Sequence, residues 1–150
     1  MDYFFIASQD EPSKVLDIAG SKHGGDLCIW QARETTNNNQ LWTLNEKGQL
    51  VSKISLVADI ANGDTIDMSS EGAKVIAWSP HDGLNQRWMF EDGKLMSGLS
   101  NLYMEADRNG DIKMKSSSNS KRQLWTLVPV EMLAHYKLMT EAAPPQCSSF

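Results

Sequence analysis

The 150-residue chain is poor in cysteine, in basic charge and in long apolar segments, and each shortage narrows what the protein can be. Of its two cysteines, Cys28 lies in an apolar run and Cys147 in a Pro- and Ser-containing tail. We therefore expect two separate reduced thiols rather than a disulfide scaffold. The formal net charge is −5, and Lys121-Arg122 is the one basic pair, which argues against nucleic acid or anionic membranes as partners.

No apolar run approaches the roughly 20 residues that a membrane-spanning helix needs, so we expect no membrane insertion. The opening residues, "MDYFFIASQDEP", carry an acid at the second position and no basic stretch, which is untypical of a signal peptide. We therefore expect a cytoplasmic protein, or one secreted without a classical signal peptide. With 41% hydrophobic and 22% charged residues, the composition is that of an ordinary globular domain.

Motifs that carry catalytic or metal chemistry are also missing. No His/Cys spacing suggests zinc, and no phosphate-binding loop, dinucleotide fingerprint or nucleophile elbow occurs. "DRNGD" at 107–111 copies the start of a calcium loop, but Ile112 and Ser118 stand where that loop needs Gly and Glu. A tight turn at Asn109-Gly110 explains this segment better. We expect no metal, no cofactor and no enzyme activity.

What the chain does have is a repeated motif. "QLWTL" occurs at 40–44 and at 123–127, with a looser relative, "QRWMF", at 86–90. The first two units share a further block upstream, "GGDLCIWQARETTNNNQLW" and "GAKVIAWSPHDGLNQRW", whereas the third, "NGDIKMKSSSNSKRQLW", lacks the earlier tryptophan. Such internal similarity is typical of a fold built from three copies of one unit.

Each unit reads as β-structure, because short runs of alternating or β-branched residues are bounded by Gly, Asn, Asp or Ser. Turns are expected at Lys47-Gly48 and Asp92-Gly93. The expected strands are 3–8, 14–19, 26–30, 40–44, 49–54, 56–61, 65–69, 74–79, 86–90, 94–98, 102–106, 112–116 and 122–127. The prediction is an all-β domain over 1–132, with lobes at about 1–47, 48–92 and 93–132. Residues 133–150 form a tail, and the segment 130–139 at its start could be a short helix unless 127–132 continues a strand.

The repeated Gln and Trp are two residues apart, so they point to the same face of a strand. A large indole on the inner face fills a core, and a neighbouring Gln amide has donors and an acceptor with which to hold a loop. We therefore predict that Trp42, Trp88 and Trp125 are core residues, one for each lobe.

Three Q-x-W motifs at this spacing, two of them preceded by Asn, resemble the ricin B-type lectin family over residues 4 to about 130. This resemblance implies a β-trefoil, with pseudo-threefold symmetry and lobes called α, β and γ. In the family, each lobe can carry a shallow sugar site. Such a site uses an Asp on the second strand, an aromatic residue ending the third strand, and the Asn-Gln of the motif.

Carried over to the α lobe, the resemblance implies a site of Asp17, Trp30, Asn39 and Gln40, with Cys28 where the family often has a polar residue. The β lobe offers Trp78, Asn85 and Gln86, with either Asp59 or Asp67 as the carboxylate. The γ lobe departs from the pattern. Its equivalents are Glu105, Lys115 or a neighbour, and Arg122, so we expect it not to bind sugar as the family does.

The resemblance therefore implies a non-catalytic lectin for galactose or N-acetylgalactosamine-type glycans and glycoconjugates, bound through the α and β lobes. Homodimerisation through the hydrophobic tail stays open. One alternative is a β-trefoil protease inhibitor that acts through the loop around 61–72. Another is a protein-interaction trefoil that has lost sugar binding.

Overall fold

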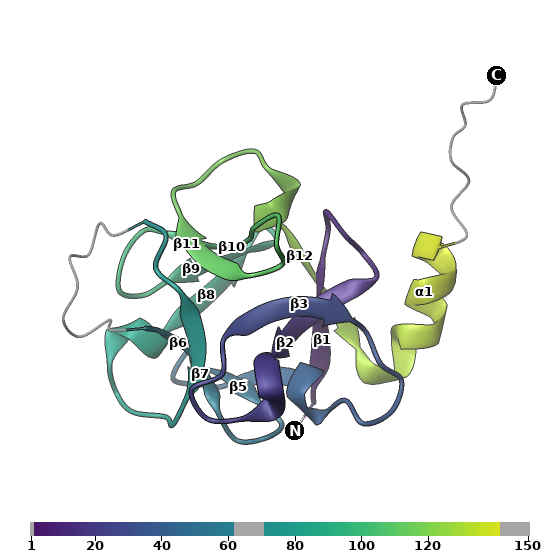
Figure 1. Ribbon diagram of the computed structural model, residues 1–150, viewed down its shortest axis with the longest axis horizontal. Helices are drawn as coiled ribbons and strands as arrows, with labels where there is room; N and C mark the ends of the chain where they lie inside the picture. Colours follow the sequence, from purple (N-terminus) through teal and green to yellow (C-terminus); the bar gives the residue numbers. More distant parts are fainter. Residues whose placement is uncertain (1, 62–70, 142–150) are drawn as a thin grey trace.

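The computed structural model describes residues 2–61 and 71–141, which form a barrel-like arrangement of antiparallel strands with one short α-helix (Figure 1). The strands of these residues are β1 (Phe4–Ser8), β2 (Lys14–Ile18), β3 (Leu27–Gln31), β4 (Trp42–Leu44), β5 (Leu50–Ser52), β6 (Val57–Ile60), β7 (Val75–Trp78), β8 (Trp88–Glu91), β9 (Lys94–Ser97), β10 (Tyr103–Ala106), β11 (Ile112–Lys115) and β12 (Trp125–Pro129). The helix is α1 (Leu133–Glu141). The all-β prediction is confirmed.

Short 3₁₀ turns precede the strand that carries each motif tryptophan. They lie at Asn38–Gln40, Leu84–Gln86 and Lys121–Gln123, and two further turns lie at Ala19–Ser21 and Val130–Met132. The Gln of every motif therefore sits at the end of a tight turn rather than within a strand. The motif tryptophan follows two residues later, at the start of the next strand.

The barrel wall forms where neighbouring lobes meet. β4 pairs with β5, β8 pairs with β9, and β12 returns to pair with β1, so the last strand closes the structure against the first. In each junction the motif tryptophan stands opposite a serine: Trp42 opposite Ser52, Trp88 opposite Ser97, and Trp125 opposite Ser8. The same register in all three junctions shows that the sequence repeat is a structural repeat.

Three hairpins, β2–β3, β6–β7 and β10–β11, stand outside this wall and touch one another in a ring. The contacts are single bridges that join the third strand of one lobe to a neighbouring lobe: Asp26 with Ile76, Cys28 with Asp111, and Lys74 with Lys113. Each hairpin therefore has its own lobe on one side and a loop of the preceding lobe on the other.

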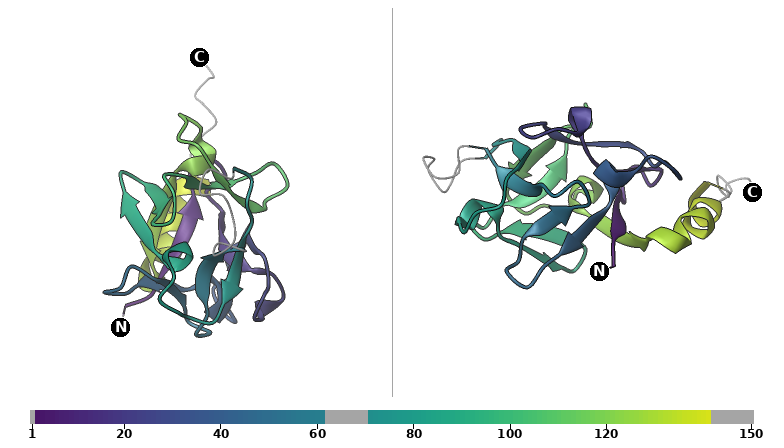
Figure 2. Two further views of the ribbon diagram at one scale, coloured as in Figure 1. Left: turned by 90° about the vertical axis from the view of Figure 1, so that its left-hand side faces the viewer. Right: turned by 90° about the horizontal axis from the view of Figure 1, so that it is seen from below.

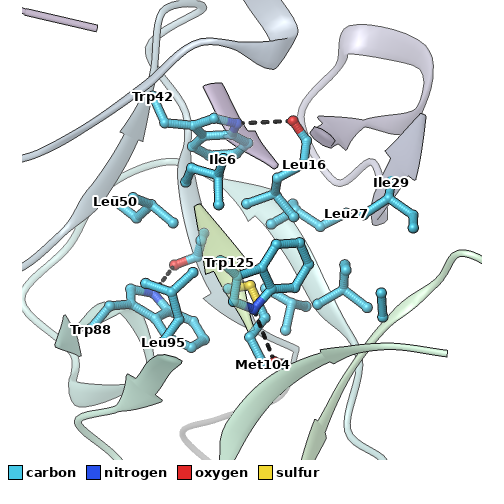
Figure 3. Packing of buried hydrophobic residues seen from close by; sticks show 14 of the residues in the cluster. Ile6, Leu16, Leu27, Ile29, Trp42, Leu50, Trp88, Leu95, Met104 and Trp125 are labelled. Atoms are coloured by element: carbon cyan, nitrogen blue, oxygen red, sulfur yellow. Dashed lines mark hydrogen bonds between the residues drawn. The ribbon is translucent and has the colours of Figure 1, made fainter. Parts of the chain in front are cut away.

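The three motif tryptophans lie in the core, as predicted, with exposed fractions of 0%, 4% and 1% for Trp42, Trp88 and Trp125. Figure 3 shows these indoles around a shared interior with Ile6, Leu50 and Leu95 between them. Each indole also satisfies its N–H by donating to a backbone carbonyl: Trp42 to Leu16 at 3.1 Å, Trp88 to Ala58 at 3.0 Å and Trp125 to Met104 at 3.3 Å. A buried indole whose N–H is paired adds apolar contact without an unmet polar group.

The predicted turns are confirmed where glycine is needed. At Asp92-Gly93 both residues have positive φ, 53° and 79°, which suits the tight hairpin between β8 and β9. At 107–111, the Asp107 carboxylate accepts from the backbone N–H groups of Asn109 and Asp111 at 2.8 and 3.0 Å, and Gly110 has φ 85°. The calcium-like segment is thus a turn closed by its own aspartate.

Helix α1 occupies part of the segment expected to be a tail. Strand β12 ends at Pro129, and the chain then turns into the helix, so both open readings of this region hold in part. Leu133 and Tyr136 pack against Phe5 and Val15 on the outer side of the first strands. Figures 1 and 2 place the helix at the edge of the molecule, far from β6 and β9.

Some predictions fall outside the described residues. These are the strand at 65–69, Asp67, the greater part of the 61–72 loop, and Cys147. In the described parts of the chain, no helix is long and apolar enough to span a membrane. Over the same residues, no group of three His, Cys, Asp or Glu side chains is placed to hold a metal ion.

Candidate functional site

The α lobe brings its predicted carboxylate and indole to one face of the β2–β3 hairpin. The register pairs Asp17 with Cys28 and Val15 with Trp30, so Asp17 and Trp30 are diagonal neighbours on the outer face. The residues that flank Asp17 on β2, and those that alternate with Cys28 and Trp30 on β3, belong to the hydrophobic core: Leu16, Ile18, Leu27 and Ile29. Trp30 is 61% exposed although it belongs to a strand of the main sheet. The hairpin therefore presents a bare indole beside a carboxylate.

The Asn-Gln pair of the motif holds this carboxylate. Asn39 donates to one oxygen of Asp17 at 2.6 Å, and Gln40 donates to the other at 3.0 Å. Gln40 also donates to the carbonyl of Gln31 at 2.9 Å and accepts from the backbone N–H of Arg33 at 2.9 Å. Gln40 is fully buried, so its amide fixes both the carboxylate and the chain that follows Trp30.

Arg33 is a member of this cluster that the sequence analysis did not identify. Its guanidinium lies 3.8 Å from the Asp17 carboxylate and donates to the Asn39 side-chain oxygen at 2.9 Å. Burial raises the pKa of Asp17, while hydrogen bonds from Gln40 and the Ile18 backbone, the Arg33 charge and Asn39 oppose that rise. The carboxylate is thus 4% exposed, strongly oriented and close to a permanent cation.

Cys28 lies between Asp17 and Trp30, on the same outer face of the hairpin. Its thiol is 3.8 Å from the Asp17 backbone carbonyl, and it is a free thiol. Burial raises its pKa to about 11, and the carboxylates of Asp17, Asp111 and Asp26 add to the effect. Cys28 is therefore a neutral, weakly polar part of the site floor rather than a nucleophile.

The β lobe repeats the arrangement with Asp59. The register pairs Asp59 with Ile76 and Val57 with Trp78, matching the α lobe position for position. Asn85 and Gln86 donate to the two Asp59 oxygens at 3.1 and 2.8 Å. The structure thus places Asp59 with the motif residues, while the other candidate, Asp67, lies outside the described residues.

His81 stands in the β lobe where Arg33 stands in the α lobe. Each donates its backbone N–H to the side-chain oxygen of the motif Gln, at 2.7 Å for His81 and Gln86. The His81 ring nitrogen Nε2 lies 3.7 Å from the Asp59 carboxylate, and Nδ1 accepts from the Gly83 N–H at 2.8 Å. His81, like Arg33, is not among the site residues expected from the sequence. Its signal is the shared spacing, since both residues follow the outer tryptophan by three positions.

Trp78 is less accessible than its α-lobe counterpart, at 39% exposed. The reason is a contact between lobes: the ring of His23 lies 3.9 Å from the Trp78 ring, centroid to centroid, at an interplanar angle of 39°. The adjoining Gly24 donates its backbone N–H to the carbonyl of Ala77 at 2.6 Å, which fixes the loop beside β7. No comparable ring contact is found at Trp30 among the described residues.

The γ lobe keeps the internal hydrogen bonds but not the outer residues. Gln123 donates to Glu105 at 3.0 Å and to the Ser116 carbonyl at 2.7 Å. The register pairs Tyr103 with Lys115, so an amine occupies the position of Trp30 and Trp78. Arg122 replaces the motif Asn. The described γ lobe therefore lacks the exposed indole and the carboxylate–Asn pair of the other two lobes.

Comparisons with known proteins identify the family of this chain. The family model described as "Ricin-type beta-trefoil lectin domain" matches residues 3–126. A designed threefold-symmetric protein, ThreeFoil, is similar at 26% identity and a TM-score of 0.69, with 84% of this chain and 97% of that one covered. A search of curated protein sequences finds no match.

Two natural lectin structures share the fold at lower identity. The β-trefoil lectin of the Vibrio vulnificus hemolysin/cytolysin, solved with N-acetyl-D-lactosamine bound, is 16% identical with a TM-score of 0.69, covering 86% of this chain and 95% of that one. The C-terminal half of an earthworm R-type lectin, solved in complex with GalNAc, is 19% identical with a TM-score of 0.65, covering 86% and 99%. The β-trefoil prediction is thus confirmed, and the chain belongs to the ricin-type beta-trefoil lectin domain family.

Proposed function

We propose that this lectin-family chain binds terminal galactose or N-acetylgalactosamine through two shallow sites, without catalysis. The α site consists of Asp17, Trp30, Asn39 and Gln40, and the β site consists of Asp59, Trp78, Asn85 and Gln86. The observation that carries the proposal is the exposed indole of Trp30 standing next to a carboxylate that two amides hold in place.

This pairing matches the chemistry of a sugar. One side of a galactose ring is a patch of C–H groups, which an exposed indole can cover, and its rim is made of hydroxyls that donate and accept. A carboxylate accepts from two adjacent hydroxyls in charge-assisted hydrogen bonds. An axial hydroxyl beside an equatorial one brings two donors to the same side, which suits a single aspartate and favours galactose-type sugars.

The Gln and the Asn of each site have different roles. Gln40 and Gln86 are fully buried and fully used inside the protein, so they act by orienting the carboxylates. Asn39 and Asn85 lie closer to the surface, at 9% and 7% exposed, and each donates to the carboxylate of its own lobe. We assign sugar contact to the Asn and positioning to the Gln.

Two sites on one rigid domain suit clustered glycans. Shallow sites of this kind bind single sugars near millimolar, which corresponds to roughly −4 kcal/mol. When both sites engage one glycan-bearing surface, the second binding event is intramolecular and the overall avidity rises without new contacts. Glycoconjugates that display several terminal galactose residues are the expected partners. The lectins from Vibrio vulnificus and earthworm, crystallised with N-acetyl-D-lactosamine and GalNAc, support this choice of ligand class.

A glycan array followed by calorimetry tests the proposal. We expect selection of terminal galactose or N-acetylgalactosamine, two binding sites for each wild-type chain, and one site after either Trp30→Ala or Trp78→Ala. The matched control is Lys115→Ala, which changes the equivalent position of the γ lobe and should leave both sites intact. Absence of binding to every glycan, or full binding by the double tryptophan variant, would disprove the proposal.

A further inference from the structure

Two of the three histidines in the chain converge on the β site, and none lies at the α site. His81 lies beside the Asp59 carboxylate, and His23 lies against Trp78. The third, His135, is exposed on helix α1. Histidine is the side chain that gains and loses charge between about pH 5 and 8, whereas the guanidinium of Arg33 stays charged throughout. The two sites therefore differ in how they respond to protons.

A backbone hydrogen bond fixes the ring of His81 beside Asp59. Its Nδ1 accepts a hydrogen bond from the Gly83 backbone N–H, so the ring hydrogen is on Nε2, which faces Asp59. Gly83 is closely packed: a Cβ added there would lie 2.5 Å from His81 Cε1 and 2.6 Å from the Asn85 side-chain oxygen. A proton on His81 Nδ1 would point at the backbone N–H of Gly83, so two hydrogen-bond donors would face each other. The segment that carries Asn85 would have to move.

The surroundings of His81 hold its backbone in place, so its ring is the part that can respond to protonation. Its backbone is held on both sides, since Gln49 donates to its carbonyl at 2.9 Å and Gln86 accepts from its N–H at 2.7 Å. The charged groups that face this loop are the Asp59 carboxylate on β6 and the ion pairs of the adjacent Asp82 with Lys47 and Arg87, at 3.8 and 3.9 Å. A protonated ring would lose its hydrogen bond from Gly83 and move against the segment that carries Asn85, which the α site with its permanent Arg33 cation does not experience.

His23 reaches Trp78 from the opposite side of the hairpin. Strand β7 pairs with β6, which carries Asp59, along one edge, and its other edge pairs with the loop around Gly24 and Gly25 of the α lobe. The neighbouring charges are Lys22 and the ion pair of Asp26 with Lys74 at 3.8 Å. The His23 ring thus contacts the indole from the α-lobe loop, which lies at the edge of β7 opposite β6. A proton there would create a cation–π contact, which draws on the same ring electrons that meet sugar C–H groups.

We propose that the β site is acid-sensitive and loses sugar in mild acid, while the α site, which holds its carboxylate with Arg33, keeps its ligand. His81 and His23 act as positioning residues for Asp59 and Trp78. The inference rests on the proposed lectin function. Its consequence is a loss of two-site avidity on acidification, because one site still binds and the other does not.

The experiment follows N-acetylgalactosamine binding by calorimetry at pH 7.5 and 5.5, using Trp30→Ala to report the β site and Trp78→Ala to report the α site. A difference of one unit in proton affinity between the free and sugar-bound states corresponds to about tenfold in sugar affinity. We expect Trp30→Ala to bind about tenfold more weakly at pH 5.5 and Trp78→Ala to change less than about twofold. His81→Gln in the Trp30→Ala background should remove most of this acid response, and His23→Gln a smaller part. His135→Gln should change nothing.

Imidazole carbon–proton NMR spectra, recorded in parallel, show where each ring titrates and whether every variant is folded. Equal affinity of Trp30→Ala at both pH values, with the His81 resonance titrating between them, overturns the inference. So does an unchanged acid response in the variant lacking both histidines of the β site. If Trp78→Ala binds sugar and Trp30→Ala does not, the inference fails and the lectin function stands through the α site. If the wild-type chain binds no glycan, the proposed function fails as well.

Discussion

Replacing Gln40 by Met tests the central structural role of the repeated motif. Gln40 is fully buried and makes three hydrogen bonds: one to the Asp17 carboxylate, one to the Gln31 carbonyl and one from the Arg33 N–H. Met has a similar length and volume but restores none of these bonds. The substitution therefore leaves a carboxylate and two backbone groups with fewer partners at nearly constant packing.

The expected cost follows from those three bonds. A hydrogen bond to a charged group contributes about 1.5 to 3 kcal/mol, and a neutral one about 0.5 to 1.5 kcal/mol. Two neutral bonds and one charged bond together give about 4 kcal/mol of lost unfolding free energy for Gln40→Met. At this chain length, that loss lowers the melting temperature by roughly 10 °C.

Gln123→Met is the matched control, because Gln123 is equally buried and makes the same three kinds of hydrogen bond. Its carboxylate partner, Glu105, is partly exposed, so water can replace the lost bond. We expect a cost of about 2 kcal/mol there. Urea unfolding followed by tryptophan fluorescence measures both values. Equal costs for the two variants, or a cost below about 1 kcal/mol for Gln40→Met, would refute the reasoning.

Three further predictions concern the helix, the thiol and the buried carboxyl. Leu133→Ala should lower the unfolding free energy by about 2 to 4 kcal/mol because Leu133 is the buried residue with which α1 joins the hydrophobic cluster of Phe5 and Val15. Leu138→Ala, at a 67% exposed position, should cost less than about 0.5 kcal/mol by the same urea assay. In a Cys147→Ser background, Cys28 of the folded protein should react with a thiol reagent at pH 8 far more slowly than Cys28 of the protein unfolded in urea. The reason is that a pKa of about 11 leaves about one thiol in a thousand ionised. Similar rates for the folded and unfolded protein would contradict this prediction. Burial raises the pKa of Asp17 above its ordinary 3.8, so its contribution to stability is present in acid and is lost as pH rises through the folded value. The unfolding free energy of the wild type should therefore fall relative to Asp17→Asn across that window, and the opposite slope would show that the hydrogen bonds outweigh burial.

The fold was predictable because its strongest signals are repeated. The three tryptophans, the glycine turns and the alternating strands each specify a local feature that the packing then keeps. Asp59 was also within reach of the sequence: "VLDIA" around Asp17 and "VADIA" around Asp59 share Val, Asp, Ile and Ala at the same positions, and 65–69 has no such match. The structural reason is that the residue before each aspartate offers its carbonyl to the motif indole.

The remaining site residues were harder to predict because their types change from lobe to lobe. Arg33 and His81 share a position and a backbone hydrogen bond, but they differ in residue type, so only their equal spacing after Trp30 and Trp78 relates them in the sequence. His23 lies 55 positions before Trp78 and belongs to another lobe, so no local pattern connects them. Contacts across lobes depend on how the three hairpins meet in the ring, which only the assembled fold defines.

The pattern of what repeats and what varies follows from burial. The motif Gln accepts from a backbone N–H and donates to a carboxylate in every lobe, and all three of these amides are fully buried, where an unmet polar group is costly. The outer position of the third strand carries no such demand, so it can be Trp30, Trp78 or Lys115 without loss of the fold. One scaffold can therefore carry an open site, a site flanked by histidines and a lobe without an exposed indole, because the bonds that maintain the fold lie beneath the residues that would meet a sugar.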